Sequence, residues 1–92
     1  MSEFRRPITI VNQRGLHARA SAKFVGAVAT MSEATQVRVA KDGNEAAGGS
    51  ILGLMMLGAA KGDTVELIVS GDNAESAFEE LCAMIEGGFG ED

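Results

Sequence analysis

Two kinds of hydrophobic pattern succeed one another along the chain. In three short stretches apolar residues tend to alternate, which predicts strands because successive side chains of a strand point to opposite faces of a sheet. These stretches are a first segment containing residues 8–11, then 35–41 and 64–69, and a fourth short strand at 44–47 is expected to return from a hairpin turn. Between them, apolar residues recur three or four positions apart, which predicts helices from about Ala18 to Thr30, from Ser50 to about Leu57, and between Asp72 and Gly87.

The order of these elements is β-α-β-β-α-β-α. It predicts an α+β fold, in which a four-stranded antiparallel sheet carries three helices on one face. The residues expected to point into the core are Ile8, Ile10, Ser21, Phe24, Val28, Met31, Val37, Val39, Leu54, Leu57, Val65, Leu67, Val69, Ala74, Phe78, Leu81 and Ile85. The strand at 44–47 is expected at an edge of the sheet, because it is short.

Local signals mark the ends of several elements. Asp42-Gly43 predicts a tight hairpin turn, since glycine accepts the positive φ that such turns require. Ser50 is placed to cap the short helix, and Asp72 with Glu75 three residues later marks the start of the last one. Gly87-Gly88 should end that helix and leave residues 89–92 as a frayed tail.

Composition narrows the class of protein. Ninety-two residues suit a single domain, and an apolar content of 46% suits an ordinary core. The single cysteine, Cys82, excludes an internal disulfide and is expected to be a small buried apolar residue of the last helix. No apolar run is long enough to span a membrane. A monomer in the cytoplasm is the expectation.

The net charge of −5 hides a strong asymmetry. Residues 1–41 hold seven Lys or Arg and two Asp or Glu, whereas residues 42–92 hold one Lys and eleven Asp or Glu. So few basic residues, without Trp or Tyr for stacking, argue against nucleic-acid binding. The basic half contains Arg14, Arg19 and Lys23 close in sequence to the only histidine, His17. These cations are either ordinary surface residues or parts of an anion site.

The segment around His17 favours the anion site. The polar turn at residues 12–15 separates the first strand from the first helix, so His17 should lie at or beside the N-cap. The free backbone N–H groups of Ala18, Arg19 and Ala20 would bind an anion there, and the Arg19 guanidinium suits phosphate oxygens. The plain alternative is a histidine that only caps the helix. No metal site is expected, because one histidine and one distant cysteine do not form a ligand set.

Two motifs make the chain similar to a known family. NQRGLHARAS contains His17, and GGSILGLMMLGAAKGD begins around Ser50. Their order and separation resemble those of the HPr family, the histidine-containing phosphocarriers of the phosphoenolpyruvate-dependent phosphotransferase system, over about residues 7–85. The resemblance implies an open-faced β-sandwich. It also implies that His17 is phosphorylated with Arg19 as its partner, and that Ser50 is the serine modified by the family's regulatory kinase.

Three residues depart from the family pattern. Ala20 and Ser21 stand where the family has proline and alanine, which should leave the first helical turn slightly looser. Gly49 stands where many relatives carry a lysine, which weakens the case for kinase recognition.

The helix that follows Ser50 is too apolar to bury all of its side chains. Ile51, Leu52 and Met55 are expected on its exposed side, as a patch suited to meeting several partners. The resemblance implies that these partners are enzyme I, enzyme IIA-type acceptor proteins and the HPr kinase/phosphorylase. Ser50 itself is either a plain N-cap or a cap that is also phosphorylated.

Three functions follow from the sequence as hypotheses. The leading one is a phosphocarrier that accepts a phosphoryl group on His17 from phosphorylated enzyme I and relays it, with no cofactor and no small substrate of its own. The second is a purely regulatory binding module whose Ser50 state selects metabolic or transcriptional partners. The third is a small-molecule-binding α/β domain, for which the sequence marks no pocket.

Overall fold

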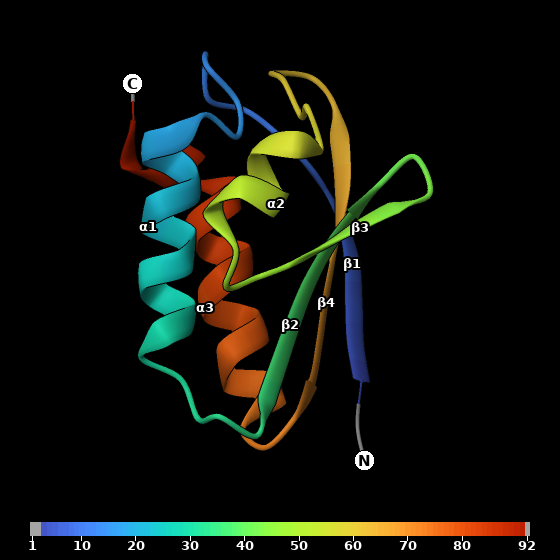
Figure 1. Cartoon of the computed structure of the whole chain (residues 1–92), viewed down its shortest axis with the longest axis vertical. Helices are drawn as coiled ribbons and strands as arrows, with labels where there is room; N and C mark the ends of the chain where they lie inside the picture. The colour runs from blue at the N-terminus through green and yellow to red at the C-terminus, as the bar shows by residue number, and fades with distance from the viewer. Residues whose placement is uncertain (1–2, 92) are drawn as a thin grey trace.

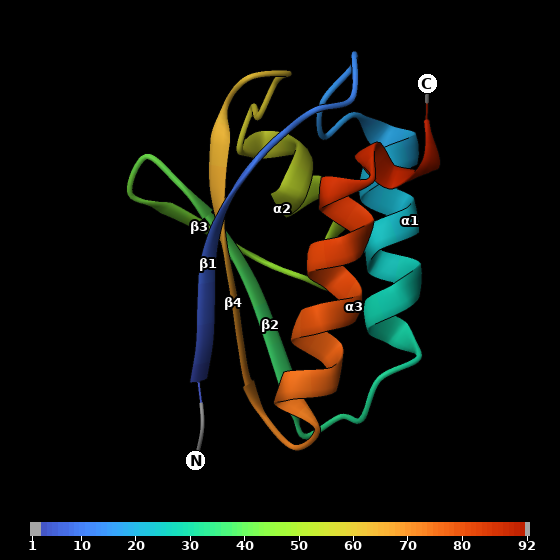
Figure 2. The same ribbon diagram turned by 180° about the vertical axis from the view of Figure 1, so that it is seen from behind.

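A computed structural model shows the arrangement of residues 3–91, which are the residues described here. The elements follow one another as β1 (Glu3–Thr9), α1 (Ala18–Ala29), β2 (Thr35–Lys41), β3 (Asn44–Ala47), α2 (Ile51–Met56), β4 (Thr64–Gly71), α3 (Ala74–Glu86) and a short 3-10 turn (Gly88–Gly90). All three α-helices cover one face of the sheet and leave the other face open (Figures 1 and 2). The predicted α+β open-faced sandwich is therefore confirmed.

The sheet is antiparallel throughout, with the strand order β1-β4-β2-β3. The short strand β3 lies at an edge, as its length predicted. The bounds of two strands differ from those that the apolar alternation indicated. β1 begins at Glu3 and ends at Thr9, so the prediction that Ile10 and Val11 lie in this strand is wrong. The ladder between β1 and β4 runs from the pair Glu3–Ser70 to the pair Thr9–Thr64, and β4 continues to Gly71, which pairs with Thr35 of β2. Backbone pairing thus extends beyond the residues whose side chains reach the core.

The core lies between the sheet and the helices. Most residues expected to point inward are buried, whereas Val28, Met31 and Leu57 are only partly buried at its margin. Ile68 is a buried residue that the alternation did not indicate, because it points to the open face of β4. There it lies between Arg5 and Arg38 in the register, and salt bridges of these arginines with Glu3 cross the same face. Cys82 is buried and unpaired.

Three of the predicted ends are confirmed and one is wrong. Asp42 and Gly43 both have positive φ, at 51° and 84°, as the hairpin requires. Ser50 caps α2 by accepting a hydrogen bond from the Gly53 N–H at 2.9 Å. Gly87 ends α3. Asp72, however, does not cap that helix: Asn73 occupies the N-cap in a left-handed conformation that leaves its side chain without a capping bond.

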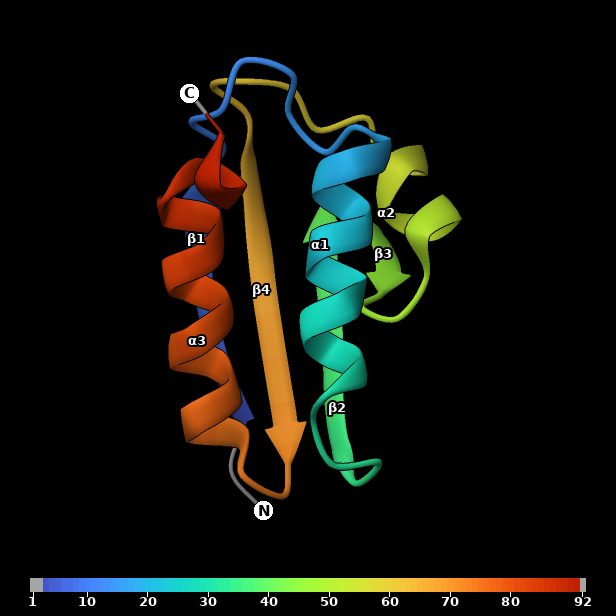
Figure 3. The same cartoon turned by 90° about the vertical axis from the view of Figure 1, so that its left-hand side faces the viewer.

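The prediction of a frayed tail after α3 is also wrong for residues 89–91, and Asp92 lies outside the described residues. Phe89 is only 2% exposed and belongs to the core cluster, so the chain after α3 turns back against the ends of α3 and α1. Gly88 and Gly90 permit this turn, with φ of 66° and 75°. The segment ends at the same end of the molecule as the start of α1 (Figures 1 and 3).

None of the helices within residues 3–91 combines the length and the apolar character that a membrane span requires.

Candidate functional site

His17 is the N-cap residue of α1, as the sequence predicted. Its backbone is extended, with φ −74° and ψ 179°, and its carbonyl accepts the first helical hydrogen bond from the Ser21 N–H at 2.9 Å. The ring nitrogen Nδ1 accepts a hydrogen bond from the backbone N–H of Arg19 at 3.3 Å. The imidazole therefore presents Nδ1 to the first turn of the helix, where the dipole of the helix is positive.

The first turn offers backbone donors at this nitrogen. The N–H groups of Ala18, Arg19 and Ala20 belong to the turn in which no helical carbonyl can pair with them. Ala20 keeps an N–H group that a proline at the same position would lack.

Ser21, the second departure from the family pattern, is completely buried, and its hydroxyl donates to the Leu16 carbonyl at 3.2 Å. This bond ties the first turn to the loop before it.

A glycine brings the loop before His17 against the loop that follows α2. Gly15 has φ +62°, and a Cβ on it would lie 2.2 Å from the Ala59 carbonyl oxygen. The Leu16 N–H donates to that same oxygen at 3.0 Å, and the Leu16 side chain is buried. The histidine is thus held between two anchored residues, Leu16 and Ser21, rather than on a free loop.

A carboxylate from the far end of the chain faces the other ring nitrogen. Glu91 Oε2 lies 2.6 Å from His17 Nε2, across 74 residues of sequence. The second carboxylate oxygen, Oε1, accepts a hydrogen bond from Asn12 Nδ2 at 3.0 Å. The side chains of His17 and Glu91 are 16% and 18% exposed, so the pair is largely shielded from water.

These contacts hold Glu91 in its ionised form. The Asn12 hydrogen bond first, and then the His17 hydrogen bond and the charge of Lys23, lower the pKa of Glu91 below its ordinary value of 4.5. Glu91 is consequently an anion at neutral pH, and it accepts from both of its neighbours.

The basic residues singled out from the sequence gather at the same place. Arg14, Arg19 and Lys23 line one open hollow together with His17 and Glu91; Gln13 and Gly90 complete its wall. Lys23 Nζ also donates to the Phe89 carbonyl at 2.7 Å. The hollow combines an imidazole, free backbone amides and three cations, which is a set of groups suited to a phosphoryl anion.

The predicted apolar patch lies on α2, which packs against α1. Ile51, Leu52 and Met55 are exposed, as expected, and Met56 extends the patch with an exposed fraction of 77%. Leu54 from the same helix is buried, so the helix divides its apolar residues between the core and the surface.

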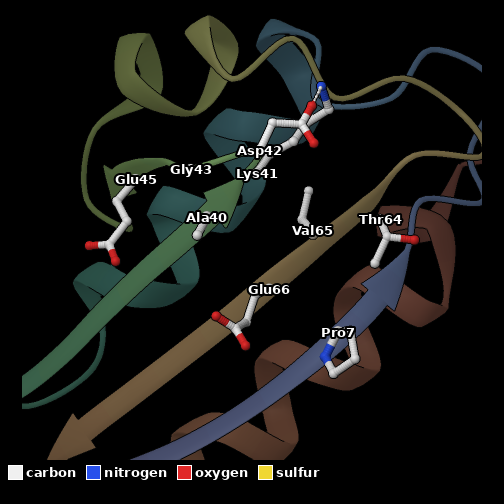
Figure 4. Close-up of a pocket in the computed structure, with 9 residues that line it drawn as sticks. All are labelled: Pro7, Ala40, Lys41, Asp42, Gly43, Glu45, Thr64, Val65 and Glu66. Carbon is white, nitrogen blue, oxygen red and sulfur yellow. Dashed lines mark hydrogen bonds and ion pairs between the residues drawn. The ribbon is translucent and has the colours of Figure 1, made fainter.

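A second hollow lies on the open face of the sheet, between the β2–β3 hairpin and the strands β1 and β4 (Figure 4). Its charged groups already have partners. Glu66 pairs with Arg5, Glu45 pairs with Arg38, and Lys41 pairs with Asp42. Across residues 3–91, no group of three His, Cys, Asp or Glu residues is placed to hold a metal ion.

Sequence reasoning missed two members of the site, Asn12 and Glu91. Asn12 reads as an ordinary turn residue, and its burial depends on the packing of the loop. Glu91 lies in a tail that looks frayed. The available signal was Phe89, a large apolar residue between glycines that could fold back and bury itself.

Known proteins are similar to this chain in sequence and in fold. The family model "PTS HPr component phosphorylation site" matches residues 4–87. The chain is 42% identical to the phosphocarrier protein HPr of Neisseria meningitidis serogroup A over 87 residues, which are 95% of this chain and 96% of that protein. It is 33% identical to the phosphocarrier protein NPr of Shewanella violacea, covering 99% of this chain and 98% of that one. The crystal structure of HPr-C-His from Thermoanaerobacter tengcongensis superposes with a TM-score of 0.87 at 40% identity, covering 100% of this chain and 99% of that one.

The match extends over nearly the whole chain and includes both the motif that contains His17 and the motif that begins around Ser50. Sequence, fold and the helix-start histidine agree, and the chain belongs to the HPr family of phosphotransferase-system phosphocarriers.

Proposed function

We propose that this protein carries a phosphoryl group on His17 between phosphorylated enzyme I and an acceptor protein of the enzyme IIA type. The observation that carries the proposal is the placement of the His17 Nδ1 atom at the open N-terminus of α1, in a hollow lined by Arg14, Arg19 and Lys23.

The geometry favours Nδ1 as the nucleophile. A neutral imidazole carries one N–H, and the contact between Nε2 and a carboxylate favours a proton on Nε2, which would leave the lone pair on Nδ1. This lone pair attacks phosphorus as the bond from phosphorus to the nitrogen of enzyme I breaks, and that electron pair returns to the donor imidazole. In the structure the Arg19 N–H donates a hydrogen bond to Nδ1. Once Nδ1 is bonded to phosphorus, this N–H is free to donate to a phosphoryl oxygen.

The charge of the carried group would be balanced by the helix start and the cations. Backbone N–H groups of the first turn donate to phosphoryl oxygens, and the Arg19 guanidinium can donate to two of them at once. Because the hollow is open, the phosphoryl group remains accessible to the acceptor protein. A histidine of the acceptor then attacks phosphorus, and His17 is the leaving group in this second transfer. The exposed patch of Ile51, Leu52 and Met55 is proposed as the surface that docks both partners.

The decisive experiment is phosphorylation by enzyme I and phosphoenolpyruvate, followed by mass spectrometry. One acid-labile phosphate on His17 is expected. His17→Ala should remain folded and unlabelled, since losing an N-cap costs about 1 kcal/mol. A His17→Ala protein that still accepts one phosphate would overturn the assignment.

A regulatory role at Ser50 is the second candidate. Ser50 caps α2 directly before the exposed patch, so a phosphate there would add nearly two negative charges at a docking surface. Incubation with the HPr kinase/phosphorylase tests it, with Ser50→Ala as the control. We also propose that the chain acts as a single-domain monomer in the cytoplasm, a reducing compartment in which the free Cys82 would persist.

A further inference from the structure

We infer that Glu91 is a positioning residue for phosphoryl transfer: its carboxylate holds the His17 ring in the form that leaves Nδ1 free to react. The inference rests on the proposed phosphocarrier function and adds a residue to it. Its basis is the juxtaposition of Glu91 Oε2, His17 Nε2 and the buried Asn12 amide, which brings the segment after α3 against the segment before α1.

The segment that bears Glu91 is anchored independently of the histidine. Phe89 is buried in the core, and its carbonyl accepts a hydrogen bond from Lys23 Nζ at 2.7 Å. Backbone bonds from Gly90 to Gly87 and from Glu91 to Gly88 close the turn. The carboxylate is therefore delivered to His17 by a folded element, and its position does not depend on a flexible surface ion pair.

Asn12 fixes the orientation of that carboxylate. Asn12 is 2% exposed, and its Nδ2 donates both to the Gly15 carbonyl at 2.9 Å and to Glu91 Oε1 at 3.0 Å. The first bond fixes the amide within its own turn, and the second holds one Glu91 oxygen. The other oxygen, Oε2, is thereby directed at His17 Nε2.

The two ring nitrogens have different partners. Nε2 faces a carboxylate, which can only accept, so the ring proton belongs on Nε2. Nδ1 faces the Arg19 N–H, which can only donate. Both contacts select the same tautomer. A carboxylate that fixes the tautomer of a reactive histidine is known to matter for catalysis in the Ser-His-Asp triad.

The placement also suits the charge that develops during transfer. When Nδ1 forms its bond to phosphorus, positive charge spreads over the ring and reaches Nε2, where the Glu91 anion stabilises it. The carboxylate bonds the ring on the nitrogen that does not react, and the cations Arg14, Arg19 and Lys23 line the same hollow. Repulsion between Glu91 and the incoming phosphate is thus opposed by these cations.

The test compares full-length wild type with Glu91→Gln, and uses Glu86→Gln as the matched control. Both substitutions remove one negative charge near the end of the chain, but Glu86 pairs with Arg6 and does not contact His17. Two measurements are made on each protein. Rapid quench gives the rate of phosphorylation by phosphorylated enzyme I, and nitrogen-15 NMR of the His17 ring reports which nitrogen carries the proton.

We expect Glu91→Gln to be phosphorylated about tenfold more slowly, the difference between a charged and a neutral hydrogen bond. Its Nε2 proton signal should move upfield and exchange faster with water, whereas Glu86→Gln should match wild type in both measurements. An unchanged or increased rate for Glu91→Gln would overturn the inference, as would an unchanged ring signal. If wild type itself accepts no phosphate, the proposed function fails, and the ring signal still decides whether Glu91 fixes the tautomer.

Discussion

Removing the Phe89 side chain should destabilise the whole protein, although this residue lies in the last described turn of the chain. The ring is 2% exposed and lies in the core with Ile10, Phe24 and Ile85. A buried Phe→Ala substitution costs about 3–5 kcal/mol, from lost burial and from the cavity that remains. We expect about 3 kcal/mol for Phe89→Ala, because a terminal turn can separate from the core and leave no closed cavity.

That loss is large relative to the total. At about 0.05–0.15 kcal/mol per residue, 92 residues give a free energy of unfolding of about 5–14 kcal/mol. With a urea m-value of about 1–3 kcal/mol/M, the midpoint should fall by about 1–3 M. Unfolding should be followed by circular dichroism, because the chain has neither Trp nor Tyr for fluorescence.

The backbone of Phe89 sharpens the prediction. Its φ of 58° lies in the left-handed region, which costs a non-glycine residue about 1–2 kcal/mol. Alanine keeps this cost and glycine removes it, so Phe89→Gly should be more stable than Phe89→Ala by about 1 kcal/mol. Met56→Ala, at a residue that is 77% exposed, should change stability by less than about 0.5 kcal/mol. A loss below about 1 kcal/mol for Phe89→Ala would show that the turn does not pack as described.

Three further outcomes are expected. Arg19→Glu should slow phosphoryl transfer at least tenfold with little loss of stability. The substitution replaces a charge-assisted hydrogen bond to the phosphoryl group with repulsion between two anions at the helix start. Equal quench-flow rates for the variant and wild type would refute this. Ser50→Asp should keep α2 capped but weaken calorimetric binding to enzyme I, because it adds a charge beside the apolar patch proposed to dock partners; indistinguishable affinities with both proteins folded would refute it. The stability that ionised Glu91 adds should be fully present above pH 4.5 and lost as pH falls through its lowered pKa, so the difference between wild type and Glu91→Gln should vanish in acid.

The sequence by itself determined the elements, their order and the position of His17 at the start of a helix. Alternation such as Val37 and Val39, and helical spacing such as Phe78, Leu81 and Ile85, are local patterns that hydrophobic burial turns into strands and helices. His17 could be placed at a helix start from its neighbours alone, because capping depends on a few consecutive residues. The motif around it was also sufficient to indicate the family.

Local patterns were insufficient where two distant segments meet. The length of β1 is set by its ladder with β4, and the burial of Ile68 by the arginines that flank it on the open face, so neither follows from its own stretch of sequence. Helix α3 begins at a left-handed Asn73 rather than at the capping signal of Asp72 and Glu75, because the turn from β4 fixes the backbone there.

The tail shows the same limit at the site. A short polar segment with glycines has no periodicity, and only the space beside Phe24 and Ile85 makes burial of Phe89 favourable. Once that ring is buried, Glu91 is carried to His17 across 74 residues. The sequence determined that His17 lies at a helix start among cations, and the tertiary structure decided which carboxylate faces it, because burial of an aromatic ring places that carboxylate and no local rule does.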